Sequence, residues 1–388
     1  MNREGAKGTV TVLVSDDLMT DQRVQRTCKA LKDNGYGVVL VGRDYPSKEV
    51  FKADYKVKKM HLVFKRSALF YGELNIRQMW YLLAHKADMV YANDMDTLLG
   101  AYIAAKIKGL PLVFDAHELF SEVPELEGRG SVKRIWQWLE RRLIPKTTAA
   151  ITVCQSVADH YEKICGVKMK VVRNVPDVDY HTDLHPAGTW DMLDNANGKD
   201  LLLYQGAVNK GRGLREIIDA MEFLEGCKLV IIGGGDLELL LKPYANHKPY
   251  GERIVFAGRK TPEELHRITP KATLGLCLME NIGLNYYYSL PNRLSDFAVA
   301  GVPVIASKFP EIERFQERYG TCTLVEEKTM KDPKGLAVEI EKALNYWKGM
   351  TEEERSIRFA LAKKELRWEE EQKKLISVLD AIKSKKRR

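Results

Sequence analysis

Short apolar segments rich in β-branched residues alternate with amphipathic segments along most of this chain of 388 residues. The apolar segments lack a polar face, which is typical of parallel strands covered by helices on both sides. The amphipathic segments between them predict helices, so the sequence indicates an α/β fold with parallel sheets. Strands are expected at 9–14, 37–41, 60–64, 88–92, 111–115 and 149–153, and again at 201–205, 228–232, 253–257, 273–278 and 302–306.

One stretch interrupts this alternation. Residues 174–200 contain proline, aspartate, histidine and glycine with little periodicity, which is typical of a linker. The sequence therefore predicts an N-terminal domain at 1–180, a linker at 181–200 and a C-terminal domain at 201–350. Residues 351–388 predict a C-terminal helix that packs back on the N-terminal domain and ends in a basic tail. We expect two doubly wound, Rossmann-like domains facing a cleft, with ligands bound by the loops that follow the strands.

The net charge of +8 is unevenly distributed along the chain. Residues 1–180 carry 28 basic and 22 acidic groups, residues 181–382 carry 28 and 31, and the last six residues add five basic groups. No segment reaches the roughly 20 apolar residues of a membrane span. Because residues 1–8 also lack a signal-like pattern and the six cysteines form no CxxC pair, a cytoplasmic protein is expected.

The loop after the first strand of the second domain contains several glycines and two cations. Gly206 begins it, and Lys210 and Arg212 lie just before the next predicted helix. Glycines allow a tight turn, and cations at a helix N-terminus favour an anion, so a diphosphate site is predicted here. The spacing differs from GxxxxGK[ST], and Glu238 occupies the third glycine position of a GxGxxG pattern, so neither a P-loop nor a nicotinamide dinucleotide site is expected.

Two further loops of this domain carry candidate donor-binding residues. Arg259 follows a strand and would lie against a base or phosphate, or else be a solvated surface arginine. Glu280 leaves a buried strand, and Ser289 and Asn292 precede a predicted helix whose free N–H groups favour anions. Asp296 lies one turn into that helix, where its carboxylate can accept hydrogen bonds from both hydroxyls of a ribose.

Two segments of the second domain resemble the donor half of the family 4 retaining glycosyltransferases, which have the GT-B fold. They are residues 206–213 and residues 276–307, and the latter include Ser289-Leu290-Pro291-Asn292. The resemblance is to the branch with an SLPN loop. It implies that Glu280 lies near the donor sugar and Asp296 on the ribose, and that Arg212 takes the place of the phosphate-binding lysine. The two acidic residues are sixteen positions apart, whereas the common family pattern places them eight apart.

The first domain carries segments that resemble the same family. Residues 16–24 resemble its loop between the first strand and helix, 91–98 resemble its H-A-H-D segment without the histidines, and 114–120 match the segment with its active-site histidine. The resemblance implies that His117 is catalytic together with Glu280. Asp94 and Glu118 are expected to bind the acceptor.

The resemblance implies a metal-independent enzyme without a cofactor, which moves a hexosyl or N-acetylhexosaminyl group with retention from a nucleotide-diphosphate-sugar to an acceptor hydroxyl. Cell-surface polysaccharide or glycolipid synthesis is the expected setting. A sugar-nucleotide epimerase and a non-catalytic nucleotide-sugar-binding protein are alternatives, the latter favoured by Ala207 and the missing histidines. A nucleic-acid partner is not expected, because the basic groups lack interleaved aromatic residues.

The basic segment 131–143 contains Trp136 and Trp138 and predicts either a packed surface helix or a helix on an anionic bilayer. With the excess positive charge of residues 1–180 and the basic tail, it favours a saccharide or lipid-linked acceptor at the inner face of a membrane.

Overall fold

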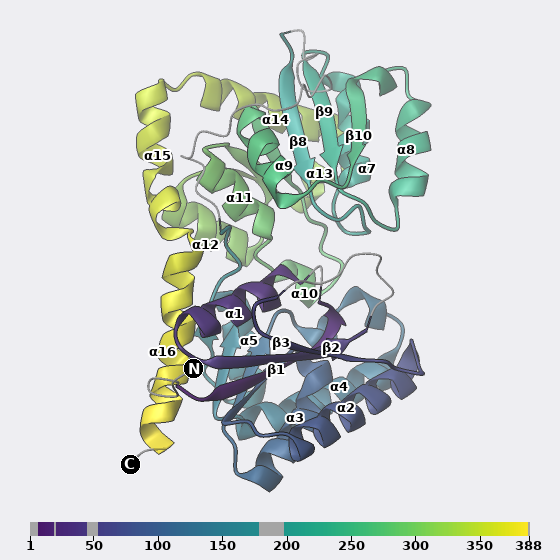
Figure 1. Cartoon of the computed structure of the whole chain (residues 1–388). Coiled ribbons are helices and arrows are strands. Elements are labelled where there is room, and N and C mark those ends of the chain that lie inside the picture. Colours follow the sequence, from purple (N-terminus) through teal and green to yellow (C-terminus); the bar gives the residue numbers. More distant parts are fainter. Residues whose placement is uncertain (1–6, 19–20, 45–52, 178–197, 387–388) are drawn as a thin grey trace. The chain divides into compact units, whose positions relative to one another are not determined.

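The computed structural model describes residues 7–18, 21–44, 53–177 and 198–386. The chain divides into two compact units: Met1–Asn174 together with Glu369–Arg388 forms the first unit, and Val175–Trp368 forms the second (Figure 1). Most of the predicted linker at 181–200 lies outside the described residues. The predicted fold class is confirmed, because each unit is built on an all-parallel sheet flanked by helices.

The sheet of the first unit has seven strands in the order β3-β2-β1-β4-β5-β6-β7. Side chains of the central strands are buried on both faces, as their unbroken apolar sequences predict. The expected strand at 60–64 is wrong: β3 instead covers the preceding lysine-rich residues, because it is an edge strand that exposes its charges to solvent. The strands are β1 (Thr9–Asp17), β2 (Gly37–Arg43), β3 (Lys56–Met60), β4 (Met89–Asn93), β5 (Leu112–Ala116), β6 (Ala149–Thr152) and β7 (Lys170–Val171).

Helices α2, α3 and α4 lie side by side along one face of this sheet, and α1 lies on the other (Figure 1). Helix α1 begins where the Asp21 side chain accepts a hydrogen bond from the Val24 N–H at 3.0 Å, an N-cap that satisfies a free donor of the first turn. The helices of this unit are α1 (Gln22–Asp33), α2 (Ser67–Ala84), α3 (Met95–Lys108), α4 (Gly130–Leu143), α5 (Gln155–Cys165) and α16 (Trp368–Lys386). Short 3₁₀ turns occupy Phe120–Glu122, Pro124–Leu126 and Ile144–Lys146.

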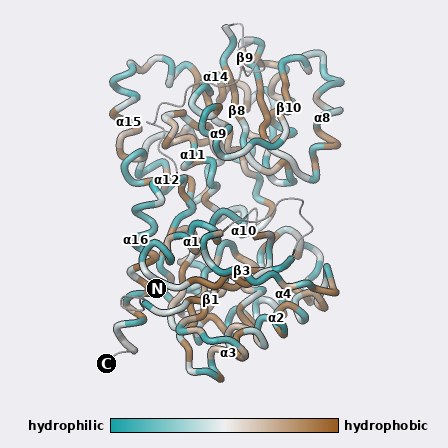
Figure 2. Tube along the Cα trace, viewed as in Figure 1, coloured by the Kyte–Doolittle hydropathy of each residue, from teal (hydrophilic) through white to brown (hydrophobic). Residues whose placement is uncertain are grey.

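The sheet of the second unit has the order β10-β9-β8-β11-β12-β13. Its strands are mainly hydrophobic in sequence (Figure 2) and bury a continuous core against the flanking helices. The strands are β8 (Asp200–Gln205), β9 (Cys227–Ile232), β10 (Ile254–Gly258), β11 (Leu274–Cys277), β12 (Val304–Ser307) and β13 (Cys322–Val325). The helices are α7 (Leu214–Ala220), α8 (Glu238–Asn246), α9 (Pro262–Ile268), α10 (Leu284–Tyr287), α11 (Asn292–Ala300), α12 (Pro310–Tyr319), α13 (Glu327–Met330), α14 (Pro333–Lys348) and α15 (Glu352–Glu365), with 3₁₀ turns at Met221–Phe223, Gly251–Arg253 and Thr269–Lys271.

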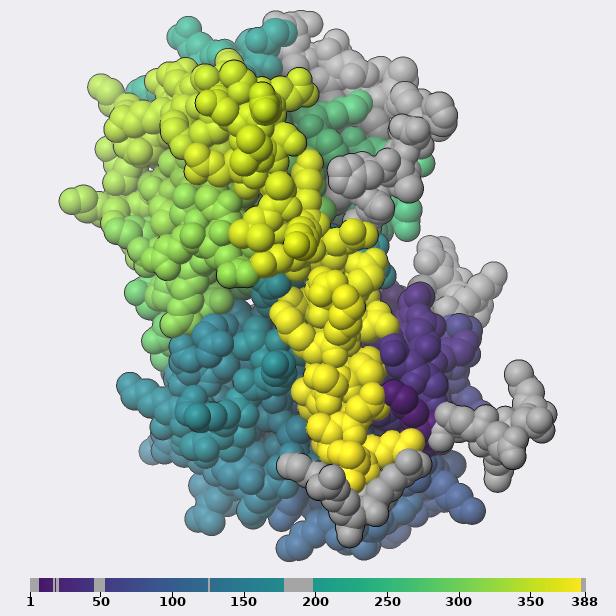
Figure 3. Space-filling model, turned by 90° about the vertical axis from the view of Figure 1, so that its left-hand side faces the viewer, coloured from purple at the N-terminus to yellow at the C-terminus, as the bar shows by residue number. Residues whose placement is uncertain are grey.

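Two helices occupy the stretch after residue 350, where the sequence predicts one. Helix α15 belongs to the second unit, whereas α16 continues from Trp368 into the first unit. On α16, Asp380 accepts hydrogen bonds from Lys7 Nζ at 2.7 Å and from Tyr36 Oη at 2.6 Å. Figure 3 shows this yellow helix packed beside the purple N-terminal residues, so the end of the chain completes the first unit.

Both sheets reverse their strand order once, between β1 and β4 in the first unit and between β8 and β11 in the second. Loops on either side of such a reversal leave in opposite directions and create a ligand site at the carboxyl ends of the strands. In the first unit, Asp94 follows β4, and His117 and Glu118 follow the neighbouring β5. In the second unit, most of the predicted residues lie after β8 and β11, and Arg259 follows the edge strand β10.

Candidate functional site

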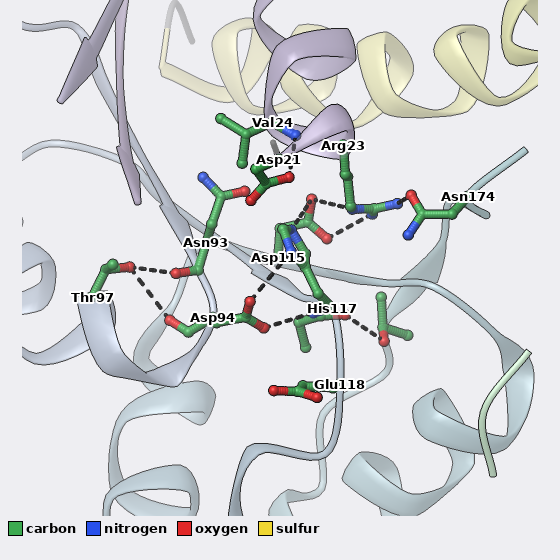
Figure 4. Close-up of polar contacts among 12 residues, drawn as sticks. Asp21, Arg23, Val24, Asn93, Asp94, Thr97, Asp115, His117, Glu118 and Asn174 are labelled. Atoms are coloured by element: carbon green, nitrogen blue, oxygen red, sulfur yellow. Dashed lines mark hydrogen bonds and ion pairs between the residues drawn. The ribbon is translucent and has the colours of Figure 1, made fainter. Parts of the chain in front are cut away.

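The carboxyl end of β4 carries the first functional side chains. Asp94 directly follows this strand and has a φ of +56°, a left-handed conformation that residues other than glycine rarely adopt. Its N–H donates to the Asp115 carbonyl oxygen at 2.9 Å, and its Oδ1 accepts from the His117 N–H at 2.8 Å. Asp94 therefore joins the ends of β4 and β5 (Figure 4).

Asp115, near the end of β5, is fully buried and is held by a guanidinium from α1. Arg23 Nη2 lies 2.7 Å from Asp115 Oδ1, and Arg23 Nε donates to Oδ2 at 3.1 Å. Tyr91 Oη donates to the same Oδ2 at 2.6 Å. Burial alone would raise the pKa of Asp115, but Arg23 and His117 together hold it below its usual range. Asp115 is thus a permanent anion within the core.

The imidazole of His117 lies between two carboxylates. Its Nδ1 is 3.2 Å from Asp94 Oδ2, and its Nε2 is 3.6 Å from Asp115 Oδ2. Burial alone would lower the pKa of His117, but the charges of Asp94 and Asp115 outweigh burial and raise it. Because each ring nitrogen faces an acceptor, the arrangement favours the imidazolium, which carries an N–H on both nitrogens.

Other acidic side chains surround this group. Burial, and to a lesser extent the nearby Glu118 carboxylate, raise the pKa of Asp96, in the first turn of α3, to about 7. Burial also raises the pKa of Asp94, an effect that His117 partly counters. Asp96 Oδ1 and Asn93 Oδ1 are buried oxygens without a hydrogen-bond partner in the described part of the chain. The site is therefore equipped to accept hydrogen bonds from hydroxyl groups.

In the second unit, the loops after β8 and β11 meet. The Glu280 carboxylate accepts a hydrogen bond from the Gly213 N–H at 3.2 Å, and the Glu280 N–H donates to the Gly211 carbonyl at 3.1 Å. Arg212, between these glycines, stacks on the Tyr286 ring at 4.8 Å. The structure therefore brings the predicted residues Glu280 and Arg212 into one site.

A second guanidinium, from Arg293 on α11, lies beside Arg212. Arg212 Nη1 and Arg293 Nη2 both contact the Met279 sulfur, at 3.3 Å and 3.1 Å. Arg293 is 5% exposed and also contacts Cys277 Sγ and the Gln205 carbonyl oxygen. Neither arginine forms an ion pair with any carboxylate that the structure describes. Burial and the charge of Arg293 lower the pKa of Arg212, so this cluster would gain stability from a bound anion.

The predicted ribose-binding residue, Asp296, lies on α11 beside the end of β8. Asp296 Oδ2 accepts a hydrogen bond from Gln205 Nε2 at 3.4 Å, and Gln205 is fixed in turn by Thr269 Oγ1 at 2.8 Å. Asn292 is the exposed first residue of α11. Ser289 uses its hydroxyl to donate to the Tyr286 carbonyl oxygen at 2.9 Å.

The remaining predicted donor residues border the same strand ends. Gly206 lies against the loop after β9: a Cβ on Gly233 would be 1.8 Å from the Gly206 carbonyl oxygen, so only glycine allows the two loops to meet. Arg259 is exposed and lies close to the backbone of Gly234: a Cβ added to Gly234 would be 2.9 Å from Arg259 Nε. Lys210 is also exposed.

Three residues of these sites escaped the sequence prediction: Arg23, Asp115 and Arg293. Arg293 and Asp115 are charged residues in apolar patterns, and such residues are rarely buried without a partner or a function. Arg23 lies in a polar segment and carries no such signal. Arg293 lies one helical turn from the buried Phe297, and Asp115 ends a strand that is otherwise apolar. That placement is the signal that identifies them.

Within the described ranges, no set of His, Cys, Asp and Glu side chains is grouped to hold a metal ion. Of the helices in those ranges, none is both long and apolar enough to cross a membrane. All six cysteines are free.

Two parallel-sheet units of this topology form the GT-B fold, and solved structures of glycosyltransferases superpose on almost the whole chain. The chain superposes on sucrose-phosphate synthase from Thermosynechococcus elongatus with a TM-score of 0.76 at 14% identity, covering 96% of this chain and 98% of that one. For HepE from Anabaena in complex with UDP and glucose, the TM-score is 0.70 at 14% identity, with 96% and 99% covered. For the lipopolysaccharide outer core galactosyltransferase WaaB, it is 0.67 at 14% identity, with 96% and 99% covered.

Family models assign both halves of the sequence. The model described as Glycosyltransferase Family 4 matches residues 21–180, and the model described as Glycosyl transferases group 1 matches residues 192–364. The chain belongs to glycosyltransferase family 4. A search of curated proteins found no match.

Proposed function

We propose that this glycosyltransferase moves a hexosyl or N-acetylhexosaminyl group from a nucleotide-diphosphate-sugar to an acceptor hydroxyl, with retention at the anomeric carbon. The observation that carries the proposal is the cluster of Arg212 and Arg293, two largely buried guanidiniums without a carboxylate partner. A diphosphate supplies the negative charge that this cluster lacks. The complex of HepE with UDP and glucose supports a donor of this class.

The cations also account for the chemistry. As the sugar leaves, negative charge develops on the diphosphate, and donors already fixed in place stabilise it without reorganising. Arg212, Arg293, Lys210 and the free N–H groups at Asn292 fill that role, so neither a metal nor a cofactor is required. Retention without an enzymic nucleophile implies that the acceptor attacks the face from which the diphosphate departs.

The other donor contacts follow from the strand ends of the second unit. Asp296 binds the ribose, and Glu280, held by the Gly213 N–H, orients the sugar. Gly206 and Ser289 border the phosphates, and Arg259 lies along the base or a phosphate.

The first unit binds the acceptor. Asp94 and Glu118 accept hydrogen bonds from acceptor hydroxyls, and His117 supplies positive charge near the reacting centre. Synthesis of cell-surface polysaccharide or glycolipid in the cytoplasm, at the inner face of the membrane, is the setting that we propose. The likeness to a lipopolysaccharide galactosyltransferase supports it.

A panel of nucleotide diphosphates and their sugars in a thermal-shift assay would identify the donor, because a bound ligand stabilises the protein by mass action. Transfer would then be measured in the presence of a chelator, with the Arg212→Ala and Asp296→Ala double variant beside the wild type and Arg215→Ala as the matched control. Loss of transfer in the double variant alone supports the site, whereas undiminished transfer contradicts it. Turnover of the sugar nucleotide without any acceptor would instead identify an epimerase.

A further inference from the structure

A deep apolar groove, separate from the two strand-end sites, lies in the first unit between α2, α3 and α4. Its volume is about 660 Å³, within the range of small-molecule sites. The lining is mainly aliphatic, methionine and aromatic side chains, with Ile76, Met79 and Leu99 among them. Ile135 of this lining exposes more than half of its surface, as do Trp80 on α2 and Trp138 on α4. Apolar surface of this extent marks a binding site.

The groove is a rigid part of the fold. The side chain of Asn75 on α2 donates to the Asp96 carbonyl oxygen at 2.6 Å and accepts from the Gly100 N–H at 2.8 Å, which fastens α2 to α3. One wall is an aromatic cluster in which Trp136 packs edge-on against Tyr71 at 5.1 Å and against Phe120 at 4.7 Å. The opening is therefore held by packed side chains and does not depend on a ligand.

The groove also adjoins the acceptor site within the same unit. Its lining includes Met95, the residue after Asp94, and Phe120, three residues after His117. Arg129 is the charged residue of this lining. It forms no ion pair with any residue that the structure describes. An occupant can therefore place a hydrocarbon chain in the groove and an anionic group at Arg129, with a hydroxyl group towards Asp94.

We infer that the groove holds the hydrocarbon chain of the acceptor, an amphiphile whose anionic head-group linkage pairs with Arg129. This inference rests on the proposed acceptor role of Asp94 and names the substrate class that it serves.

Gly72 offers a way to fill the groove without disturbing the fold. It lies on α2, lines the groove, and a Cβ there would meet no atom within 4 Å. Gly72→Phe therefore places a ring in the groove and at the same time removes a helix-weakening glycine. Gly226→Phe is the matched control, because Gly226 is exposed in the second unit and its Cβ would also meet nothing.

The probe is an alkyl phosphate with a bromine atom on its chain, which quenches the fluorescence of nearby tryptophans such as Trp136. We expect the wild type and Gly226→Phe to be quenched and Gly72→Phe to bind at least about tenfold more weakly. Arg129→Gln should weaken binding of the alkyl phosphate but not of an uncharged alkyl maltoside. Quenching that is equal in Gly72→Phe and wild type would overturn the inference.

Other occupants and a failure of the proposed function give different results. If a second copy of the chain covers the groove, light scattering will show a dimer for the wild type and a monomer for Gly72→Phe. That result overturns the inference. If the wild type and Gly72→Phe bind equally well to vesicles with anionic lipids, and the free alkyl phosphate quenches neither, the groove contacts a membrane surface. That result also overturns the inference. If sugar is transferred to water-soluble saccharides but the amphiphile does not bind, only this inference fails. If the amphiphile binds but no sugar is transferred to any acceptor, the proposed function fails, and the amphiphile is then not an acceptor.

Discussion

The carboxyl ends of the two sheets have the same topology and opposite electrostatics. In the first unit, carboxylates surround His117, and the buried cation Arg23 is fully matched by Asp115. In the second unit, Arg212 and Arg293 lie together without a matching carboxylate in the described residues. In the first site the buried cation is neutralised, and the unpartnered oxygens of Asn93 and Asp96 can accept hydrogen bonds from hydroxyls, whereas the cations of the second site need an anion.

This contrast runs against the charge of each half of the sequence. Residues 1–180 have the excess of basic groups and residues 181–382 the excess of acidic groups. Many basic groups of the first half are exposed on its surface, for example on α4 and β3, while its strand ends are acidic. Net charge over a domain therefore says little about the ligand, because the local cluster at the strand ends decides which ligand binds.

The largest expected effect concerns the matched pair of the first unit. Asp115→Asn would leave the buried Arg23 without its anion, and breaking a buried pair in this way costs about 3 to 5 kcal/mol. Urea unfolding should show that loss. Asp33→Asn, which removes an exposed ion pair with Lys29, is the control and should lose far less. Equal stability of Asp115→Asn and wild type would contradict the pairing.

In the second unit, removing the buried charge of Arg293 should not destabilise the protein, in contrast to Asp115→Asn in the first unit. Arg293→Met takes away an unmatched charge, so the protein should unfold at the same or a higher temperature. Sugar transfer should nevertheless fall about 100- to 1000-fold, because a preorganised cation is lost from the departing diphosphate. A stable variant with undiminished transfer would remove Arg293 from the site.

The pH dependence of stability tests the imidazolium of His117. Because its pKa is raised in the folded state, His117 stabilises the protein fully below the unfolded value of about 6.5. That stabilisation is lost as the pH rises from there through the raised pKa of the folded state. In His117→Gln, the decline of melting temperature with rising pH should be shallower over this window. An identical decline in both proteins would assign the pH dependence to another group.

The smallest effect expected is that of a free anion. Pyrophosphate should raise the melting temperature of the wild type modestly, equivalent to about 1 to 3 kcal/mol at saturating concentration. The shift should shrink with added salt and vanish in Arg212→Ala. A shift of equal size in Arg212→Ala would locate the anion elsewhere.

The sequence predicted most of the fold because strand and helix periodicities are local properties. The alternation predicted the central strands of both sheets, but it did not predict β7 and β13, the short strands at the edge of each sheet. Strand β3 was misplaced because an edge strand need not be apolar. In the site, Glu280, Arg212 and Asp296 were found from strand-end position and resemblance. The contact of Arg23 with Asp115 joins residues 92 positions apart, which only the packed structure brings together.

The return of α16 has a consequence for how the protein is made. The first unit is discontinuous in sequence: residues 1–174 leave the ribosome long before 369–388, with the whole second unit between them. Until α16 arrives, the groups that it contacts, such as Tyr36 and Arg173, lack their partners Asp380 and Glu371. The first unit therefore reaches its final form only after the second unit has been synthesised, which reverses the usual order of vectorial folding.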